Sequence, residues 1–195
     1  MIEFSCISAG FAIWYTYDPT VKAELFSTAF LAGNDLTLID PIALPPAHRA
    51  ELDSIGRVAR IVVTNANHLR DTLNFTYSAP IFAPPELNAE VIHNHVLSDG
   101  LQVGSLQAIK VEGAAPGEFA LYHAKDGGTL IVGDALINFE PHGFGLLPKK
   151  YCSSQKQMIR SLRRLLDFDF DCIFFAHGHP IMTRGRDRLA LLLDS

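Results

Sequence analysis

The most informative apolar run of the chain ends in a polar segment, in the stretch Val58-Ala59-Arg60-Ile61-Val62-Val63-Thr64-Asn65-Ala66-Asn67-His68. The first part of this stretch has the apolar content of a buried strand, and the part from Thr64 onward is polar. Open α/β sheets bind their ligands in the crevice beyond the carboxyl ends of their strands. The stretch therefore predicts a strand that delivers polar side chains to a site.

Three more apolar runs end in the same way. They are Leu36-Thr37-Leu38-Ile39-Asp40-Pro41, Thr129-Leu130-Ile131-Val132-Gly133-Asp134 and Cys172-Ile173-Phe174-Phe175-Ala176-His177-Gly178-His179. Because strand ends meet at one rim of such a sheet, residues far apart in the sequence can converge there. The residues that we expect to converge are Asp40, Asn65, Asn67, Asp134 and His177.

The apolar spacing along the whole chain predicts clusters of strands that alternate with helices in two halves. Strands are expected near 4–15, 24–32, 36–40, 58–64, 101–104, 106–111, 118–123, 129–133 and 172–175, and helices near 46–55, 153–166 and 185–193. A further helix is expected from His68, with Asn67 as its N-cap, and 141–148 is expected to be a loop. This order is typical of two sheets packed face to face and covered by helices. We therefore predict an α/β (α+β) fold in a single domain, residues 1–195.

The bulk composition limits the partners and the location. Of the 195 residues, 48% are hydrophobic and 19% are charged, as in a foldable globular chain. The net charge of −5 argues against a nucleic-acid surface, and no apolar stretch is long enough to span a membrane. Cys6, Cys152 and Cys172 are odd in number and widely separated, which favours reduced thiols. The start also lacks the basic leader of a secretory signal, so we predict a soluble cytoplasmic protein.

Five short motifs occur in a characteristic order. They are Ile39-Asp40-Pro41, Thr64-Asn65-Ala66-Asn67-His68-Leu69-Arg70, Gly113-Ala114-Ala115-Pro116-Gly117, Gly133-Asp134 and Ala176-His177-Gly178. In their order and their placement at strand ends they resemble the motifs of the metallo-β-lactamase superfamily over nearly the whole chain. The resemblance implies a four-layer αβ/βα sandwich. It also implies a hydrolase that uses one or two zinc-like ions to generate a hydroxide.

The resemblance also implies where the metal ligands of the family would lie, and most of those positions have lost their ligand. The replaced positions are those of Asn65, Asn67, Leu69, Arg70 and Ala114, and the two that keep a ligand are Asp134 and His177. An Asn side chain offers a neutral carbonyl oxygen, which is a weak ligand for zinc, and Leu and Ala offer none. We therefore expect no cofactor, or at most a single zinc-like divalent ion at Asp134 and His177.

These observations leave three interpretations of function. The one we favour is a hydrolase-like protein whose dinuclear site is largely lost, inactive or non-classical, with a cleft that binds an unknown small molecule. The alternative is a metal-dependent hydrolase of the ester, thioester or phosphoester class. Its relic single-ion site would combine Asp134 and His177 with Asn67, His68 or Asp71, or His177 would act as a general base without metal. The third is a non-catalytic subunit that forms a homodimer through its N-terminal hairpin, in which the turn Asn34-Asp35 joins two strands.

Arg70 is the most informative replacement in the cleft. A buried carboxylate needs a counter-charge once the ion is gone, so Arg70 is expected to pair with Asp134 or Asp40. The alternative is a surface residue at the start of a helix.

The other cleft candidates have structural alternatives as well. His68 and Asp71 can cap a helix, and His179 either shapes the pocket or lies exposed on its loop. Glu140, His142 and Tyr151 belong to a segment that often borders the cleft in the family, whereas His93 and His95 are expected in a polar loop away from it. The candidate cleft residues are therefore Asp40, Asn65, Asn67, His68, Arg70, Asp71 and His179, beside the catalytic candidates Asp134 and His177.

Overall fold

The computed structural model describes residues 3–8, 10–75, 79–87, 95–139 and 143–195. The first half of the chain forms a seven-stranded sheet with the strand order β1-β2-β3-β4-β5-β6-β7. Pairing is antiparallel from β1 to β4 and parallel from β4 to β7. The strands are β1 (Glu3–Ser8), β2 (Phe11–Asp18), β3 (Ala23–Ala32), β4 (Asp35–Ile39), β5 (Arg57–Val62), β6 (Ile81–Ala83) and β7 (His95–Val96).

The second half forms a five-stranded sheet with the order β14-β11-β10-β9-β8. Its strands pair in antiparallel fashion except for β11 and β14, which are parallel. The strands are β8 (Gln102–Val103), β9 (Leu106–Lys110), β10 (Phe119–His123), β11 (Thr129–Val132) and β14 (Cys172–Phe175). A separate hairpin consists of β12 (Leu136–Phe139) and β13 (Gly143–Leu146).

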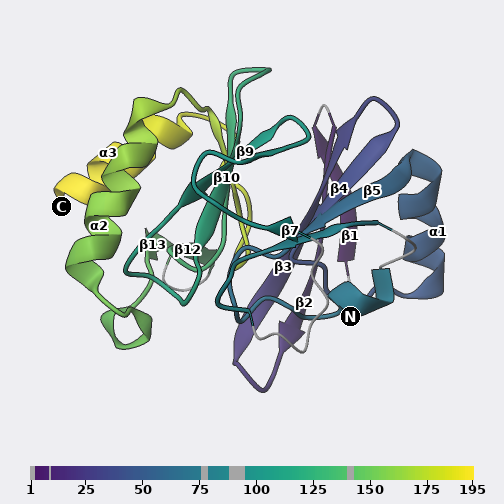
Figure 1. The fold of residues 1–195 in the computed structure, drawn as a ribbon, viewed down its shortest axis with the longest axis horizontal. Coiled ribbons are helices and arrows are strands. Elements are labelled where there is room, and N and C mark those ends of the chain that lie inside the picture. The colour runs from purple at the N-terminus through teal and green to yellow at the C-terminus, as the bar shows by residue number, and fades with distance from the viewer. Residues whose placement is uncertain (1–2, 9, 76–78, 88–94, 140–142) are drawn as a thin grey trace.

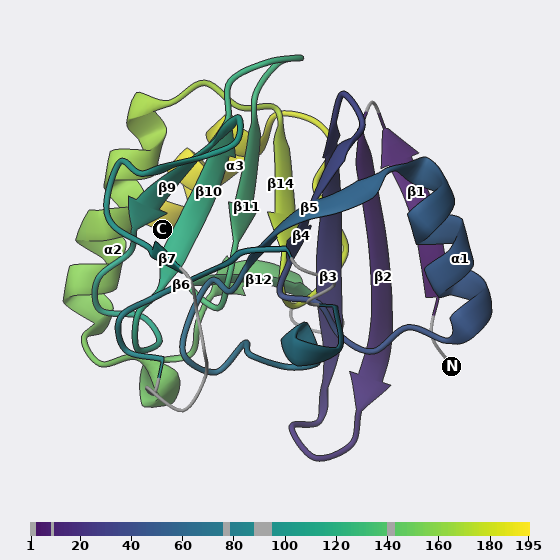
Figure 2. The ribbon, with the colours of Figure 1, turned by 45° about the vertical axis from the view of Figure 1, so that its right-hand side comes forward.

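The two sheets lie face to face, and helices cover the outer side of each (Figures 1 and 2). Helix α1 (Pro46–Ile55) packs on the first sheet, whereas α2 (Gln155–Arg164) and α3 (Gly185–Asp194) pack on the second. This is the predicted four-layer αβ/βα sandwich. Among the residues described, no helix has the length and apolar content needed to cross a membrane.

Three layers of buried side chains hold the sandwich together. The middle layer lies between the sheets and includes Phe26, Phe119 and Phe174, which are almost completely buried. Trp14 and Leu52 belong to the layer between the first sheet and α1. Each such side chain stabilises the fold by roughly 1.5–3 kcal/mol through the removal of apolar surface from water.

Helix α2 forms where the sequence predicts it. Its N-cap is Ser154, whose side chain accepts a hydrogen bond from the Gln157 N–H. Met158 and Leu162 are spaced by about one helical turn and are fully buried against the second sheet. The cap satisfies one of the free N–H groups of the first turn, and the apolar face fixes the helix to the sheet.

The structure corrects two sequence-based boundaries. The strand expected over 4–15 is two strands, β1 and β2, because the chain turns at Gly10 and pairs back on itself. Part of the loop expected over 141–148 is β13, which pairs with β12. Its glycines and aromatic residue gave no alternating pattern from which a strand could be predicted.

The helix expected from His68 is wrong. The segment after β5 runs through turns and reaches only a 3-10 turn at Thr72–Phe75. Arg70 has a φ of 44°, which is incompatible with a right-handed helix. The N–H of Asp71 donates to the Pro41 carbonyl (3.0 Å) rather than to a helical acceptor. Tertiary contacts with the end of β4 thus override the local propensity.

Candidate metal centre

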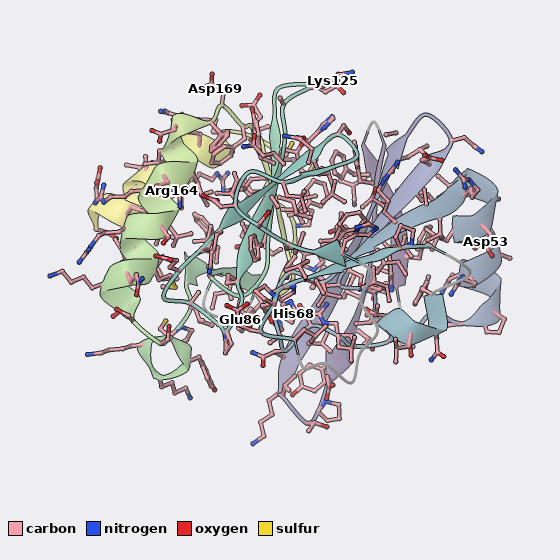
Figure 3. All side chains as sticks on the ribbon, in the orientation of Figure 1. Asp53, His68, Glu86, Lys125, Arg164 and Asp169 are labelled. Atoms are coloured by element: carbon pink, nitrogen blue, oxygen red, sulfur yellow. The ribbon has the colours of Figure 1, made fainter. Side chains whose placement is uncertain are left out.

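The ends of four strands bring the candidate residues together. Asp40 directly follows β4 and His68 lies in the turns after β5, so both come from the first sheet. Asp134 follows β11 and His177 follows β14, so both come from the second sheet. Figure 3 shows His68 between the two halves of the sandwich. The site therefore lies where the two sheets meet.

Three of these side chains form a compact group of metal-binding type. The ligand atoms of His68, Asp134 and His177 all lie within 4.8 Å of one another. Asp134 Oδ1 is 3.0 Å from His68 Nε2 and 3.1 Å from His177 Nε2. The His68 side chain is 4% exposed, whereas those of Asp134 and His177 are 12% and 16% exposed. The group is thus buried on the His68 side and partly exposed at Asp134 and His177.

The outer nitrogens of both histidines face acceptors. His177 Nδ1 lies 2.9 Å from the Glu24 carbonyl oxygen, and His68 Nδ1 lies 2.9 Å from Asp40 Oδ2. A carbonyl or a carboxylate can only accept, so each Nδ1 carries a hydrogen. In the neutral ring, each Nε2 then presents its lone pair to Asp134 Oδ1. These lone pairs and the negative Asp134 oxygen repel one another. A cation between the atoms, or a further proton on a ring, removes this repulsion.

Asp40 is held in place by hydrogen bonds from the end of β5. Its Oδ1 accepts the Thr64 N–H (2.7 Å), and its Oδ2 accepts the Thr64 hydroxyl (2.5 Å). The carbonyl of Asp40 accepts from the Ser27 hydroxyl at 2.7 Å. Asp40 has a φ of 48°, a left-handed conformation that costs on the order of 1 kcal/mol or more. These contacts aim the carboxylate at His68.

Arg70 lies beside the group, but in the described part of the chain it pairs with no carboxylate. Its Nη1 donates to the carbonyls of Phe26 (2.5 Å) and Asp40 (3.0 Å), and its Nη2 to that of Ala176 (3.3 Å). The predicted ion pair with Asp134 or Asp40 is therefore wrong, as is the prediction of a surface residue. The planar fork matches three main-chain carbonyls from both sheets, and the charge still acts on both carboxylates at longer range.

The charges of the group shift one another's pKa. Burial raises the pKa of Asp134 and of Asp40, but the charge of His68, together with the hydrogen bonds and other positive charges around each carboxyl, leaves both pKa values below the ordinary value. Burial lowers the pKa of His68, but Asp134 and Asp40 outweigh burial and the opposing charge of Arg70, and they raise it to about 9. In the metal-free protein the His68 ring is therefore protonated on both nitrogens and positively charged at neutral pH. The charges of two cations, His68 and Arg70, then balance those of the two carboxylates Asp40 and Asp134.

Glu118 also belongs to this region, although the sequence did not single it out. It is buried and directly precedes β10. Its Oε1 accepts the Ala135 N–H (3.0 Å), and its Oε2 accepts from Asn65 Nδ2 (2.8 Å). Burial and the charge of Asp134 raise the pKa of Glu118 to about 8. The one signal in the sequence was an acidic residue that opens an apolar run directly after a Pro-Gly turn.

The loop that carries His177 is fixed by the β12 hairpin. The Asn138 N–H donates to the His177 carbonyl (2.9 Å), and Asn138 Nδ2 donates to the His179 carbonyl (2.7 Å). Gly178, with a φ of 112°, lies so close that a Cβ there would be 1.8 Å from the Asn138 oxygen. Glycine is therefore required between the two histidines.

Four other predicted cleft residues do not join the converging ligand atoms. Asn65 is buried, and its Oδ1 accepts the N–H of Asn67, which is itself exposed. Asp71 accepts a hydrogen bond from Asn74 Nδ2 (2.7 Å). His179 is exposed and contacts two aromatic rings of β2 and β3 edge-on.

The remaining sequence candidates lie elsewhere or outside the described residues. Tyr151 is exposed after the β12 hairpin, and His95 lies in β7, stacked on an aromatic ring of β6. His93, Glu140 and His142 fall outside the described residues.

Among the described residues, the donor set of His68, Asp134 and His177 fits one metal ion. The Asn65 amide is engaged by Glu118, Leu69 packs against the core beneath α1, and Ala114 is buried in the core beneath α2. Two imidazole nitrogens and one carboxylate oxygen, with a fourth position open, are a usual set for catalytic zinc. Metal-bound histidines also usually donate their second N–H to a carboxylate or carbonyl. That is the arrangement seen at His68 and His177.

Comparison with known proteins agrees with this architecture. A family model described as the metallo-β-lactamase superfamily matches residues 7–195. The DIM-1 metallo-β-lactamase superposes with a TM-score of 0.78 at 11% identity, over 99% of this chain and 97% of that one. A metallo-β-lactamase from Pontibacter korlensis gives 0.76 at 16% identity, over 100% of both chains. TMB-1 superposes with a TM-score of 0.76 at 13% identity, over 99% of this chain and 97% of that one.

At these identities the structural likeness shows the fold alone. No curated protein matches the chain. The family model, in contrast, matches the sequence itself from the first strand of the sandwich to its last residue. The chain therefore belongs to the metallo-β-lactamase superfamily.

Proposed function

We propose that this chain is a hydrolase that depends on a single zinc-like ion held by His68, Asp134 and His177. The observation that carries the proposal is the orientation of the two rings. Each Nδ1 faces an acceptor, so each Nε2 is directed at Asp134 Oδ1, at 3.0 and 3.1 Å. Ligand atoms about 2.0–2.2 Å from a tetrahedral ion are about 3.3–3.6 Å apart, so a small outward movement of the two rings would admit the ion.

The residues around this set have separable roles. Asp40 and the Glu24 carbonyl fix the rings, and Arg70 fixes the carbonyls of both sheets next to them. The substrate approaches from the solvent side, where Asp134 and His177 are partly exposed. When bound, a zinc-like ion supplies Lewis-acid chemistry and stabilises hydroxide near neutral pH. The substrate class that we propose is an ester, thioester or phosphoester.

A second candidate function is a metal-free binding protein, in which the hydrolytic site has decayed. The observation that favours it is the balance of charge, because protonated His68 and Arg70 together match the two carboxylates without an ion. The chain would then keep a cleft for a small molecule but would have no cofactor. The two candidates differ in whether an ion or a proton lies between Asp134 and the histidines.

Metal analysis of the purified protein separates the candidates. We expect about one zinc-like ion per chain after purification without chelator, and reloading after chelator treatment. His68→Gln and His177→Gln should each bind far less metal. His179→Gln is the matched control, because His179 shares the loop of His177 but lies outside the converging group. Wild-type protein without metal, even after incubation with zinc, manganese or iron, would contradict the proposal and favour the second candidate.

Activity is measured on the same samples. Chromogenic esters, thioesters and phosphoesters are compared with metal-loaded and chelator-treated protein. We expect hydrolysis of at least one class to depend on the ion and to be lost in His177→Gln but kept in His179→Gln. Equal rates with and without the ion would indicate a general-base reaction at His177 and contradict the metal mechanism.

A further inference from the structure

Glu118 joins the two loops that carry the proposed ligands. Its Oε1 accepts the N–H of Ala135, the residue directly after Asp134, at 3.0 Å. Its Oε2 accepts from Asn65 Nδ2, in the loop of His68, at 2.8 Å. The side chain is 1% exposed, so water does not compete for these bonds. One carboxylate thus connects a loop of the first sheet to a loop of the second.

Asn65 passes this connection on to His68. Its Oδ1 accepts the Asn67 N–H (2.9 Å), its carbonyl accepts the His68 N–H (3.1 Å), and its Nδ2 lies 3.4 Å from His68 Nδ1. The side chain therefore shapes the turn that places the imidazole. Asn65 is also the position at which a family member would carry its first histidine ligand. Here that position makes a hydrogen bond within the protein instead.

The space for the bridge comes from Gly133. A Cβ at this position would lie 2.7 Å from Glu118 Oε1 and 2.7 Å from Thr64 Oγ1. The absence of a side chain at Gly133 therefore admits Glu118 between the two loops.

We propose that the Glu118–Asn65 pair positions His68 against Asp134 and thereby sets the affinity of the site for its ion. The part of this inference that concerns the ion rests on the proposed function, whereas the part that concerns the His68 ring does not. Glu118 acts through Asn65 and Ala135, so it is a positioning residue and not a catalytic one.

The hydrogen-bond pattern allows a reversal test. In Glu118→Gln, the oxygen of the new side chain can accept from only one of the two donors, Asn65 Nδ2 or the Ala135 N–H. The new NH₂ group then faces the other donor, so one hydrogen bond is lost. In Asn65→Asp, two carboxylates face each other. In the double variant N65D/E118Q, the new amide at position 118 donates to the new carboxylate at position 65, while the amide oxygen still accepts the Ala135 N–H. The bond between the two side chains is restored in the reversed direction, and the pair still consists of one acid and one amide.

Two readouts follow the variants. The first is zinc affinity, measured by competition with a chromophoric chelator. We expect each single variant to bind zinc at least about tenfold more weakly than wild type, as is usual when a residue that supports a metal ligand is changed. The double variant should recover most of the lost zinc affinity. The second is the imidazole ¹⁵N spectrum of His68 in metal-free protein, assigned with His68→Gln. Its signals should shift in the single variants and return in the double variant. Glu51→Gln, on the exposed side of α1, is the control.

The outcomes separate this inference from the proposed function. The inference would be overturned if the single variants match wild type in both readouts. It would also be overturned if the double variant recovers neither zinc affinity nor the His68 signals beyond the worse single variant. If one single variant does not fold, the other and the double variant still give the comparison. If wild-type protein binds no zinc, the proposed function fails. The His68 signals then decide the inference alone: shift and recovery support it, and unchanged signals overturn it.

Discussion

At the scale of single residues, the site depends on where hydrogens are placed. His68 and His177 are both oriented through Nδ1, one by the Asp40 carboxylate and the other by the Glu24 carbonyl. That orientation turns both Nε2 atoms toward Asp134. A histidine whose outer nitrogen had no acceptor would be free to rotate or to change tautomer, and the ligand set would be lost.

Asp40→Asn tests the carboxylate behind His68. The amide can accept from Thr64 or from the His68 Nδ1–H, but its NH₂ must face a donor, so the ring loses its fixed orientation. We expect zinc affinity to fall about 10- to 100-fold, measured by chelator competition. Asp53→Asn, at an exposed position of α1, should bind zinc as wild type does. Unchanged affinity in Asp40→Asn would show that the ring is held by other contacts.

Arg70→Ala tests the guanidinium that bridges the sheets. Three carbonyls, those of Phe26, Asp40 and Ala176, would lose a charged donor. We expect the free energy of unfolding in urea to fall by about 3 kcal/mol. The free energy of unfolding of Arg70→Lys should lie between those of wild type and Arg70→Ala, because an ammonium keeps the charge but not the planar fork. Arg188→Ala, on the exposed face of α3, is the control, and an equal effect of both Ala variants would refute the bridging role.

At the scale of elements, the site is built from loops that follow strands, and each loop is anchored by another element. The β12 strand anchors the His177 loop through Asn138, and Glu118, directly before β10, anchors the loops of His68 and Asp134. Loops that carry functional residues are usually positioned by a rigid scaffold in this way. The anchors come from elements that are distant in sequence.

Gly178→Ala tests the contact between β12 and the His177 loop. The new Cβ would lie 1.8 Å from the Asn138 oxygen in a backbone conformation that L-residues rarely adopt. We expect the free energy of unfolding to fall by more than about 2 kcal/mol, together with loss of metal binding. Gly145→Ala in the same hairpin is the matched control, because its Cβ would meet no atom within 4 Å. Its stability should stay within about 0.5 kcal/mol of wild type.

At the scale of the whole molecule, the proposed ligands come from both sheets. His68 belongs to the first sheet and Asp134 and His177 belong to the second, so an ion would link the two halves of the sandwich. The apolar layer between the sheets already joins them through side chains such as Phe174. Metal binding and global stability should therefore be coupled.

Zinc titration of unfolding tests this coupling. At a free zinc concentration about 100-fold above the dissociation constant, the free energy of unfolding should rise by about 2.7 kcal/mol, provided that zinc binds the folded state alone. The measurement is urea unfolding of chelator-treated protein at several zinc concentrations. His177→Gln should show no rise, whereas His179→Gln should rise as wild type does. A rise of the same size in His177→Gln would place the ion elsewhere.

The arrangement of apolar runs was enough to predict much of this molecule. Strand ends at Asp40, Asp134 and His177 followed from local patterning, and together with the motif order they gave the family and the four-layer sandwich. A buried strand leaves its mark on consecutive residues, so it can be recognised without knowledge of distant contacts. The cytoplasmic location, the homodimer and the loss of the metal site stay predictions.

The choice among neighbouring polar residues was settled by long-range geometry. Asn67, His68 and Asp71 were equal candidates in the sequence, and a turn in which Arg70 is left-handed places His68 beside Asp134. Glu118 becomes part of the site through its contacts with Ala135 and with Asn65, which is 53 positions away in the chain. Which side chain points inward after a strand depends on backbone turns and on hydrogen-bond partners from other elements. Such contacts leave no periodic trace in the local sequence, so folding had to reveal them.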